Sequence, residues 1–142
     1  MSSPLGTRTD SAASTVSVLI VDDQPPFRDV ARTVVSLLKG WTIVAEAATG
    51  EDAVVAARDT EPGIVLMDIN LPGISGIEAT RRIVAAAPKT RVILVSTYQA
   101  ADLPSGADSC GAAGYVNKEE FGPAVVLDLW AKRSTDGDGT GT

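Results

Sequence analysis

Histidine is absent from the 142 residues, and cysteine occurs once, at Cys110. Without histidine the usual zinc ligand sets cannot form, and a lone cysteine excludes an internal disulfide, so we expect Cys110 to be a small buried hydrophobe. No apolar run approaches the roughly 18 residues of a membrane span, and the N-terminus has neither a basic start nor an apolar signal core. We therefore expect a cytoplasmic protein without membrane insertion.

Positive charge is also scarce. Twelve Lys and Arg residues face 18 Asp and Glu residues, which gives a formal net charge of −6. Proteins that bind nucleic acid through a basic face gain affinity by neutralising phosphates, so this balance argues against direct DNA binding. An acidic chain is better suited to a hard cation that prefers oxygen ligands.

The chain does have enough apolar material for one globular core, since 44% of its residues are hydrophobic. Residues 1–15 are rich in Ser, Thr, Ala and Gly, and residues 134–142 contain only Ser, Thr, Asp and Gly. Neither segment has hydrophobic periodicity, which is typical of disordered tails. The sequence therefore predicts one domain over residues 16–133 between two tails.

Within this domain, short apolar runs alternate with stretches of helical periodicity. The predicted strands are residues 16–21, 41–45, 64–68, 91–95 and 114–117. The predicted helices are residues 26–38, 50–60, 76–87 and 123–132. This alternation indicates an α/β fold with a parallel sheet covered on both faces. The predicted architecture is flavodoxin-like, a doubly wound (βα)5 domain with strand order 2-1-3-4-5.

The fourth strand-helix unit is an exception. A helix should lie between residues 98 and 114, but Leu103-Pro104-Ser105-Gly106 and the small residues that follow have little apolar periodicity and poor helix propensity. We expect a short or irregular fourth helix.

The central strand ends in an aspartate, Asp68, and is bounded by Pro62-Gly63 and Pro72-Gly73. In open α/β sheets, ligands bind beyond the carboxyl ends of the strands. An aspartate there can also serve only to shape the turn or to cap a helix. The predicted strand order favours a chemical role, because it brings Asp22 and Asp23, at the end of the first strand, beside Asp68.

These carboxylates repel one another and raise at least one pKa unless a cation neutralises them. Mg²⁺ fits best, since it uses one or two carboxylates together with waters and phosphate oxygens. Ser96 and Lys118, at the ends of the fourth and fifth strands, face the same crevice and complete a cradle for a phosphoryl group. Asp68 is the nucleophile that such a site would use.

Several motifs closely resemble the receiver domain of bacterial two-component response regulators. They are Val18-Leu19-Ile20-Val21-Asp22-Asp23, Leu66-Met67-Asp68-Ile69-Asn70-Leu71-Pro72-Gly73, Val95-Ser96 and Tyr115-Val116-Asn117-Lys118. The resemblance covers about residues 16–132. The runs Asp22 to Arg28 and Gly76 to Ala79 are most similar to the NarL/FixJ-type subgroup, whose receivers normally precede a DNA-binding helix-turn-helix. None follows residue 132, so we expect a stand-alone receiver.

The resemblance implies a role for each matching residue. Asp68 would be the phospho-acceptor. Asp23 would ligate Mg²⁺ directly together with the backbone carbonyl of Asn70, and Asp22 would act mainly through metal-bound water. Ser96 would follow the phosphoryl oxygens, while Tyr115 would swing from an exposed to a buried position as a switch. The same protein would not be an enzyme beyond its own phosphotransfer and dephosphorylation.

The resemblance also implies the partners. A sensor histidine kinase or a phosphotransfer protein would supply the phosphoryl group, and an unknown downstream protein would receive the signal. The irregular fourth helix lies on the usual output surface of the family, so we expect a monomer or a weak dimer. Trp41 and Trp130 are expected to be packing aromatics.

Two other functions remain open. The chain could be a receiver-like binding module whose output does not depend on phosphorylation. It could also be an aspartyl-phosphate hydrolase of the haloacid-dehalogenase type, but that class needs a second acid two residues after the nucleophile, where this chain has Asn70. For the receiver, Asn70 could orient the attacking water and Tyr98 could shield the phosphoryl group, which predicts moderately slow self-dephosphorylation.

Overall fold

The structure is a computed structural model that describes residues 15–140, with side chains up to residue 131. Its centre is a five-stranded parallel sheet of order β2-β1-β3-β4-β5, as the sequence predicts. The strands are β1 (Val16–Val21), β2 (Trp41–Ala47), β3 (Ile64–Asp68), β4 (Arg91–Ser96) and β5 (Gly114–Asn117). Every residue of β3 is buried, which explains why this central strand is a continuous apolar run.

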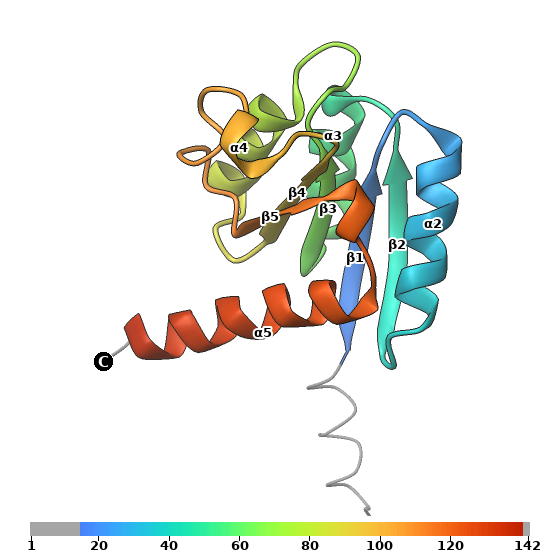
Figure 1. Cartoon of the computed structure of the whole chain (residues 1–142), viewed down its shortest axis with the longest axis vertical. Helices are drawn as coiled ribbons and strands as arrows, with labels where there is room; N and C mark the ends of the chain where they lie inside the picture. The colour runs from blue at the N-terminus through green and yellow to red at the C-terminus, as the bar shows by residue number, and fades with distance from the viewer. Residues whose placement is uncertain (1–14, 141–142) are drawn as a thin grey trace, which may run out of the picture.

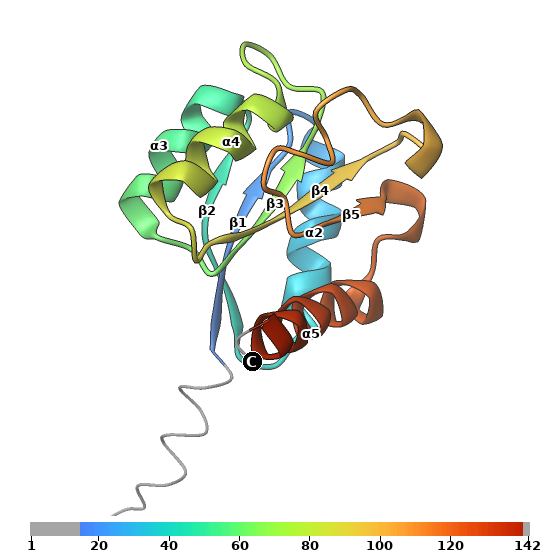
Figure 2. The same ribbon diagram turned by 90° about the vertical axis from the view of Figure 1, so that its left-hand side faces the viewer.

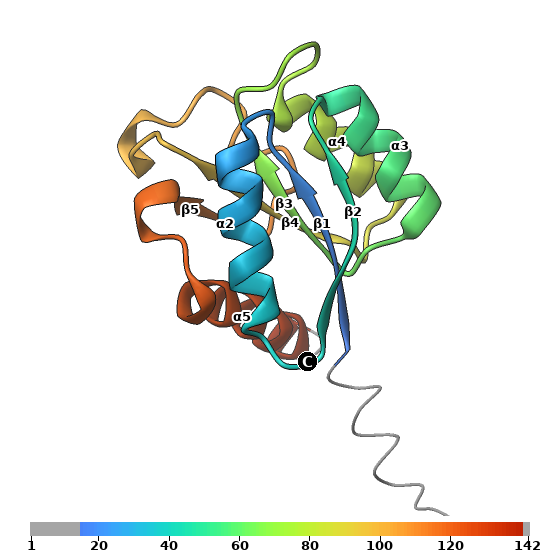
Figure 3. The same cartoon turned by 90° about the vertical axis from the view of Figure 1, so that its right-hand side faces the viewer.

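Helices cover both faces of the sheet (Figure 1). The helices are α2 (Pro25–Ser36), α3 (Gly50–Thr60), α4 (Gly76–Ala86) and α5 (Pro123–Thr140). Figures 2 and 3 show α3 and α4 side by side on one face, and α2 and α5 on the other. The flavodoxin-like prediction is therefore confirmed.

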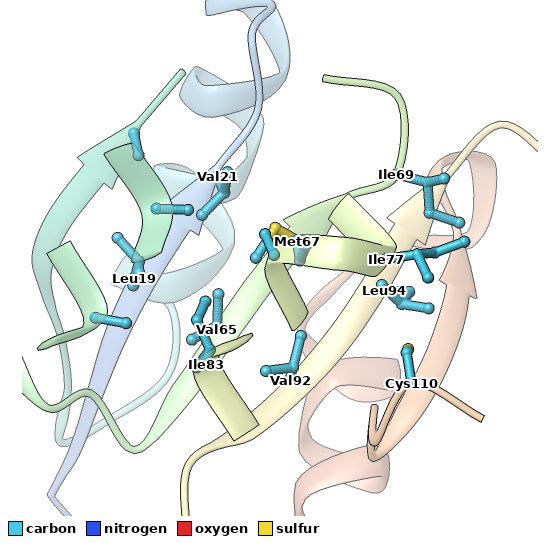
Figure 4. Packing of buried hydrophobic residues seen from close by; sticks show 14 of the residues in the cluster. Leu19, Val21, Val65, Met67, Ile69, Ile77, Ile83, Val92, Leu94 and Cys110 are labelled. Atoms are coloured by element: carbon cyan, nitrogen blue, oxygen red, sulfur yellow. The ribbon is translucent and has the colours of Figure 1, made fainter. Parts of the chain in front are cut away.

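The core on the α3 and α4 side is built from the inward-facing residues of three neighbouring strands (Figure 4). Met67 and Leu94 are almost fully buried there, and Ile77 and Ile83 of α4 belong to the same cluster. Alternate residues of the same strands, such as Leu66 and Ile93, face α2 and α5 instead. Burying both faces fixes the register of each strand, because a slip of one residue would exchange the two faces.

Side-chain caps begin the two helices on this face. The Thr49 hydroxyl accepts a hydrogen bond from the Asp52 N–H at the start of α3, and the Ser75 hydroxyl accepts one from the Glu78 N–H at the start of α4. Such a cap contributes about 1 kcal/mol to helix stability. Both helices therefore begin at defined positions beside the carboxyl end of the sheet.

The segment between β4 and β5 contains a single 3₁₀ turn, η1 (Ala100–Asp102), and no α-helix among its described residues 97–113. Gly106 and Gly111 have positive φ angles of 91° and 97°, which right-handed helices do not contain. Ala107 and the predicted buried Cys110 still close the core over β4. The expected short or irregular fourth helix is confirmed, and it is reduced to one turn.

Most predicted boundaries agree with the structure within two residues, but the last helix is longer than predicted. We expected it to end at about Lys132, because Gly137, Gly139 and their neighbours have low helix propensity. Its backbone continues to Thr140. A second difference is a short 3₁₀ turn, η2 (Lys118–Glu120), which the sequence did not predict.

Trp41 and Trp130 pack against each other, with ring centroids 5.7 Å apart, near the amino ends of the strands. The Arg91 guanidinium lies 4.0 Å from the Trp130 ring centroid. Both tryptophans are thus packing aromatics, as predicted. The predicted N-terminal tail lies outside the described residues except for Thr15, and disorder at both ends stays a prediction. None of the described helices is both long and apolar enough to cross a bilayer.

Candidate functional site

The candidate site lies at the edge of the sheet where four strands end. Asp22 follows β1, Asp68 ends β3, Ser96 ends β4 and Lys118 follows β5. Strand pairing sets their relative heights, since Asp68 is in register with Val95, the neighbour of Ser96. The sequence predicted this convergence, because the carboxyl ends of parallel strands meet at one edge of the sheet.

Asp22, Asp23 and Asp68 form a compact acidic cluster, in which one carboxylate oxygen of each lies within 4.8 Å of the others. Asp22 and Asp68 are only 1% and 6% exposed, whereas Asp23 is exposed. The pKa of Asp68 is raised from 3.8 to about 7. Burial is the largest cause and the neighbouring Asp22 charge the second, while the Lys118 ammonium lowers the pKa only in part. The cluster thus carries more negative charge than its surroundings neutralise.

Lys118 supplies the nearest positive charge. Its Nζ lies 2.7 Å from Asp22 Oδ2 and 3.8 Å from Asp68 Oδ1. The same ammonium lies 4.5 Å from the ring centroid of Phe27, which in turn packs on Phe121 at 5.1 Å. Two carboxylates and an aromatic face therefore hold the lysine over the pocket.

The Asp22-Asp23 turn is held by neighbouring backbone and side chains. The Gln24 N–H donates to Asp22 Oδ1 at 2.8 Å, and Arg28 of α2 donates to the Asp22 carbonyl at 2.6 Å. Arg28 also lies 3.5 Å from the Glu46 carboxylate on β2. These contacts position the acidic turn between α2 and the sheet.

The loop after Asp68 returns closely on the strand. The Gly76 N–H donates to the Ile69 carbonyl at 2.8 Å, and a Cβ atom on Gly76 would lie 1.9 Å from the Asp68 carbonyl oxygen. Only glycine permits this approach. The Ile74 N–H donates to Glu51 Oε2 at 3.1 Å, which ties the loop to the first turn of α3. This loop contains Asn70, whose backbone carbonyl is the predicted metal ligand.

Hydroxyl groups surround the other side of the pocket. Ser96 is buried, and its Oγ accepts a hydrogen bond from the Tyr98 N–H at 3.1 Å. The Tyr98 hydroxyl donates to Asn70 Oδ1 at 3.4 Å, so the two side chains predicted to affect dephosphorylation contact each other. The Tyr115 hydroxyl lies 3.5 Å from Ser96 Oγ and donates to the Tyr98 carbonyl. Tyr115 is half-buried and turned toward Ser96.

The pocket has a volume of about 240 Å³. It is lined by Asp23, Gln24, Asp68, Asn70, Ser96, Thr97 and Lys118. Carboxylate and carbonyl oxygens are the donors that Mg²⁺ prefers. The buried Oδ2 of Asp22 makes no hydrogen bond within the described chain, and its close neighbour is the Lys118 ammonium. The donor set and the excess negative charge therefore fit a hard divalent cation.

The structure brings the predicted site residues together at this pocket and adds contacts that we did not predict. Phe27 packs against the core on the α2 side, and its ring also lies beside Lys118. Asn117 was noted only as part of a motif, but it is 7% exposed and makes several hydrogen bonds. A polar residue at a buried strand end was the signal that could have identified it.

Fold and site together define a flavodoxin-like α/β domain. It has an acidic pocket suited to a divalent cation at the carboxyl edge of its sheet. The sequence model of the response regulator receiver domain matches residues 18–128. The chain belongs to this family. Receiver domains are signalling domains of two-component systems that typically bind Mg²⁺ at an acidic pocket and interact with histidine kinases or phosphotransfer partners.

Two relatives place the chain in the NarL/FixJ-type subgroup. Response regulator UvrY of Escherichia coli K12 is 39% identical over 111 residues, which are 78% of this chain and 51% of UvrY. Response regulator GacA of Pseudomonas aeruginosa is 36% identical over 103 residues, which are 72% of this chain and 48% of GacA. The chain thus spans about half the length of the curated relatives it matches.

Solved structures agree with this assignment. A two-component response regulator of the LuxR family from Aurantimonas sp. SI85-9A1 is 36% identical, with a TM-score of 0.76 over 86% of this chain and 87% of that chain. The signal receiver domain of the putative response regulator NarL from Mycobacterium tuberculosis is 29% identical, with a TM-score of 0.74 over 81% of this chain and 95% of that chain.

Proposed function

We propose that this protein is a phosphorylatable receiver whose acceptor is Asp68. One carboxylate oxygen of Asp68 attacks the phosphorus of a phospho-histidine on the donor protein. A P–O bond forms, the P–N bond of the donor breaks, and the released histidine nitrogen regains a proton. The observation that carries the proposal is the position of Asp68, which is buried at the floor of the pocket with Lys118 3.8 Å away.

Mg²⁺ would be held by Asp23, Asp68 and the Asn70 backbone carbonyl, with Asp22 acting through bound water. When bound, the cation supplies positive charge that favours the ionised form of Asp68 and offsets the charge of the phosphoryl oxygens. This matters because Asp68 must be deprotonated to act as a nucleophile, and its pKa of about 7 lies near neutral pH.

Ser96 and Lys118 would receive the phosphoryl oxygens. The lysine ammonium provides a charge-assisted hydrogen bond, and the Ser96 hydroxyl provides a neutral one. To do so, the ammonium moves from its ion pair with Asp22, at 2.7 Å, toward Asp68. The Ser96 hydroxyl turns toward the new group, and Tyr115, already beside it, fills the space behind. The arrangement thereby couples phosphorylation to the surface around β4 and β5.

The remaining parts of the proposal concern context. We infer that the protein acts in the cytoplasm with a sensor histidine kinase or phosphotransfer protein as donor. This receiver domain signals through protein contacts, as a monomer or weak dimer, without contacting DNA itself. The family assignment supports the choice of donor class.

The proposal is tested by intact mass after incubation with Mg²⁺ and a small phosphodonor. Acetyl phosphate and phosphoramidate serve as donors, because the latter has the P–N bond of a phospho-histidine. We expect one added phosphoryl group in the parent, none in Asp68→Asn, and none with a chelator present. The absence of any addition from both donors would overturn the proposal and favour a phosphorylation-independent binding module. Addition that persists in Asp68→Asn would show that another residue is the acceptor and would overturn the assignment of Asp68.

A further inference from the structure

Asn117 is a buried polar residue at the end of β5 that the mechanism above does not use. Its Oδ1 accepts a hydrogen bond from the Glu119 N–H at 2.8 Å. Its Nδ2 donates to the Tyr98 carbonyl at 3.0 Å and to the Thr97 carbonyl at 3.4 Å. A carboxamide has two N–H donors and one acceptor oxygen, so the side chain is fully engaged.

These hydrogen bonds join two loops that carry functional groups. The Tyr98 carbonyl belongs to the loop after β4, which begins at Ser96, and the Glu119 N–H belongs to η2, which begins at Lys118. Ser96 and Asn117 are in register on the paired strands. The carboxamide therefore links the backbone next to the hydroxyl with the backbone next to the ammonium.

The loop after β4 depends on such side-chain contacts. Its described residues, 97–113, contain no α-helix that could fix its path. The Tyr98 carbonyl accepts hydrogen bonds from both Asn117 and the Tyr115 hydroxyl. The Tyr98 N–H in turn donates to Ser96 Oγ at 3.1 Å, so the position of Tyr98 decides where the Ser96 hydroxyl lies.

We propose that Asn117 is a positioning residue that sets the separation between the Ser96 hydroxyl and the Lys118 ammonium for binding a phosphoryl group. The inference rests on the proposed function of Asp68. The hydrogen bonds of Asn117 go to Thr97, Tyr98 and Glu119, none of which is a proposed metal ligand, so we expect its effect to fall on the phosphoryl group and not on the metal. Burying a carboxamide is costly unless its hydrogen bonds are made, and here all of them serve this link.

A purely structural role for Asn117 is the cap of η2, and a suitable substitution separates the two roles. Asn117→Ser retains a short acceptor that can cap the Glu119 N–H, because serine is a good N-cap residue. It loses the two amide donors to Thr97 and Tyr98 and adds no charge. Asn117→Leu removes both roles. Ser75→Ala, which removes the cap of α4, is a control for loss of stability alone.

The probe is beryllofluoride, a tetrahedral mimic of the phosphoryl group that binds to an aspartate carboxylate. Its affinity is measured by calorimetry at saturating Mg²⁺, next to the affinity for Mg²⁺ alone. In Asn117→Ser we expect beryllofluoride affinity to fall about tenfold, as for loss of a hydrogen bond in a buried site, while Mg²⁺ affinity changes less than about twofold. Ser75→Ala should retain both affinities.

Each result has a distinct meaning. If Asn117→Ser binds beryllofluoride as the parent does, Asn117 has no positioning role. If it loses Mg²⁺ and beryllofluoride affinity in proportion, as a loss of folding would cause, the role is structural and the inference is wrong. If the parent itself binds no beryllofluoride, the proposed function of Asp68 fails and the inference falls with it.

Discussion

The two sides of the pocket are built in different ways. On the acidic side, Asp22 and Asp23 follow β1 and Asp68 ends β3. The adjoining loops are tied to α2 and α3 through Arg28 and Glu51. On the other side, residues 97–113 replace a helix with one 3₁₀ turn, and the backbone near Ser96 is held by hydrogen bonds from single side chains. We call these the helical side and the loop side.

We infer from this difference that the two sides have different functions. Metal binding requires oxygen ligands at fixed positions, which strands and capped helices provide. A response to phosphorylation requires an element with two accessible arrangements, and a loop held by a few replaceable hydrogen bonds can rearrange at lower cost than a packed helix. In this protein the helical side would therefore bind the cation, and the loop side would respond to the phosphoryl group.

The charge on the helical side can be tested through pH. Without divalent cations, the native state retains the Asp68 proton between pH 3.8 and about 7, whereas the unfolded chain releases it. The free energy of unfolding should therefore decrease as pH rises through this window and level off above it, by at most roughly 4 kcal/mol from this group. Asp68→Asn should lose that slope and exceed the parent in stability at pH 8.

Urea unfolding at several pH values with a chelator present measures this effect. Added Mg²⁺ should reduce the slope in the parent, because the bound cation favours the ionised carboxylate, and should leave Asp68→Asn unchanged. If the free energy of unfolding depends on pH equally in the parent and in Asp68→Asn, Asp68 is not the carboxylate whose pKa is raised in the native state.

On the helical side, the backbone at Gly76 approaches the Asp68 carbonyl so closely that no side chain fits between them. Gly76→Ala places a Cβ atom 1.9 Å from the Asp68 carbonyl oxygen, so the loop or the strand must move. We expect a loss of about 3 kcal/mol in the free energy of unfolding together with weaker Mg²⁺ binding. Gly122→Ala is the matched control, because a Cβ atom there meets nothing within 4 Å. Similar unfolding midpoints for the two variants would contradict this prediction.

Phe27 joins the two sides, since it belongs to α2 and its ring lies 4.5 Å from Lys118 Nζ. Phe27→Leu retains an apolar side chain but removes the aromatic face, which is worth about 1 kcal/mol to a partly buried ammonium. We expect phosphorylation by acetyl phosphate to slow about fivefold, at unchanged Mg²⁺ affinity. Phe121→Leu keeps the lysine contact and should remain near the parental rate. An equal loss in both variants would indicate a packing effect alone.

The smallest expected effect concerns the lifetime of the phosphorylated protein. The Tyr98 hydroxyl contacts Asn70 Oδ1 across the mouth of the pocket, a geometry that supports the predicted shielding role. Tyr98→Glu should shorten the lifetime a few-fold, because a carboxylate there can orient the attacking water. Tyr98→Phe, which loses only the hydroxyl, should have a smaller effect. Loss of phosphoprotein is followed by intact mass after the donor is removed, and an unchanged lifetime in Tyr98→Glu would rule out shielding.

The sequence predicted the helical side better than the loop side for physical reasons. The strands β1 and β3 are largely apolar buried runs; Asp22 directly follows β1 and Asp68 ends β3. Such local patterns need no tertiary information. The missing helix could be predicted as well, since proline and glycine act locally. The convergence of Asp22 with Asp68 followed from the strand order alone.

The supporting contacts could not be predicted from the sequence. The hydrogen bond from Asn117 to Tyr98 joins residues 19 positions apart, and that from Ile74 to Glu51 spans 23 positions. No periodicity links such pairs, because they meet only after the sheet has formed. The predicted end of α5 was wrong for a different reason. The low helix propensity of Gly137 and Gly139 favoured an earlier end, but the helix continues to Thr140.

Hydrogen exchange of backbone amides, measured without ligand, with Mg²⁺, and with Mg²⁺ plus beryllofluoride, tests the division between the two sides most directly. Mg²⁺ alone should slow exchange in residues 22–24 and 69–76. Beryllofluoride should then change exchange in residues 96–99 and 115–121, on the loop side. If beryllofluoride alters only the segments that Mg²⁺ already protects, the loop side does not respond to the phosphoryl group and the account is wrong.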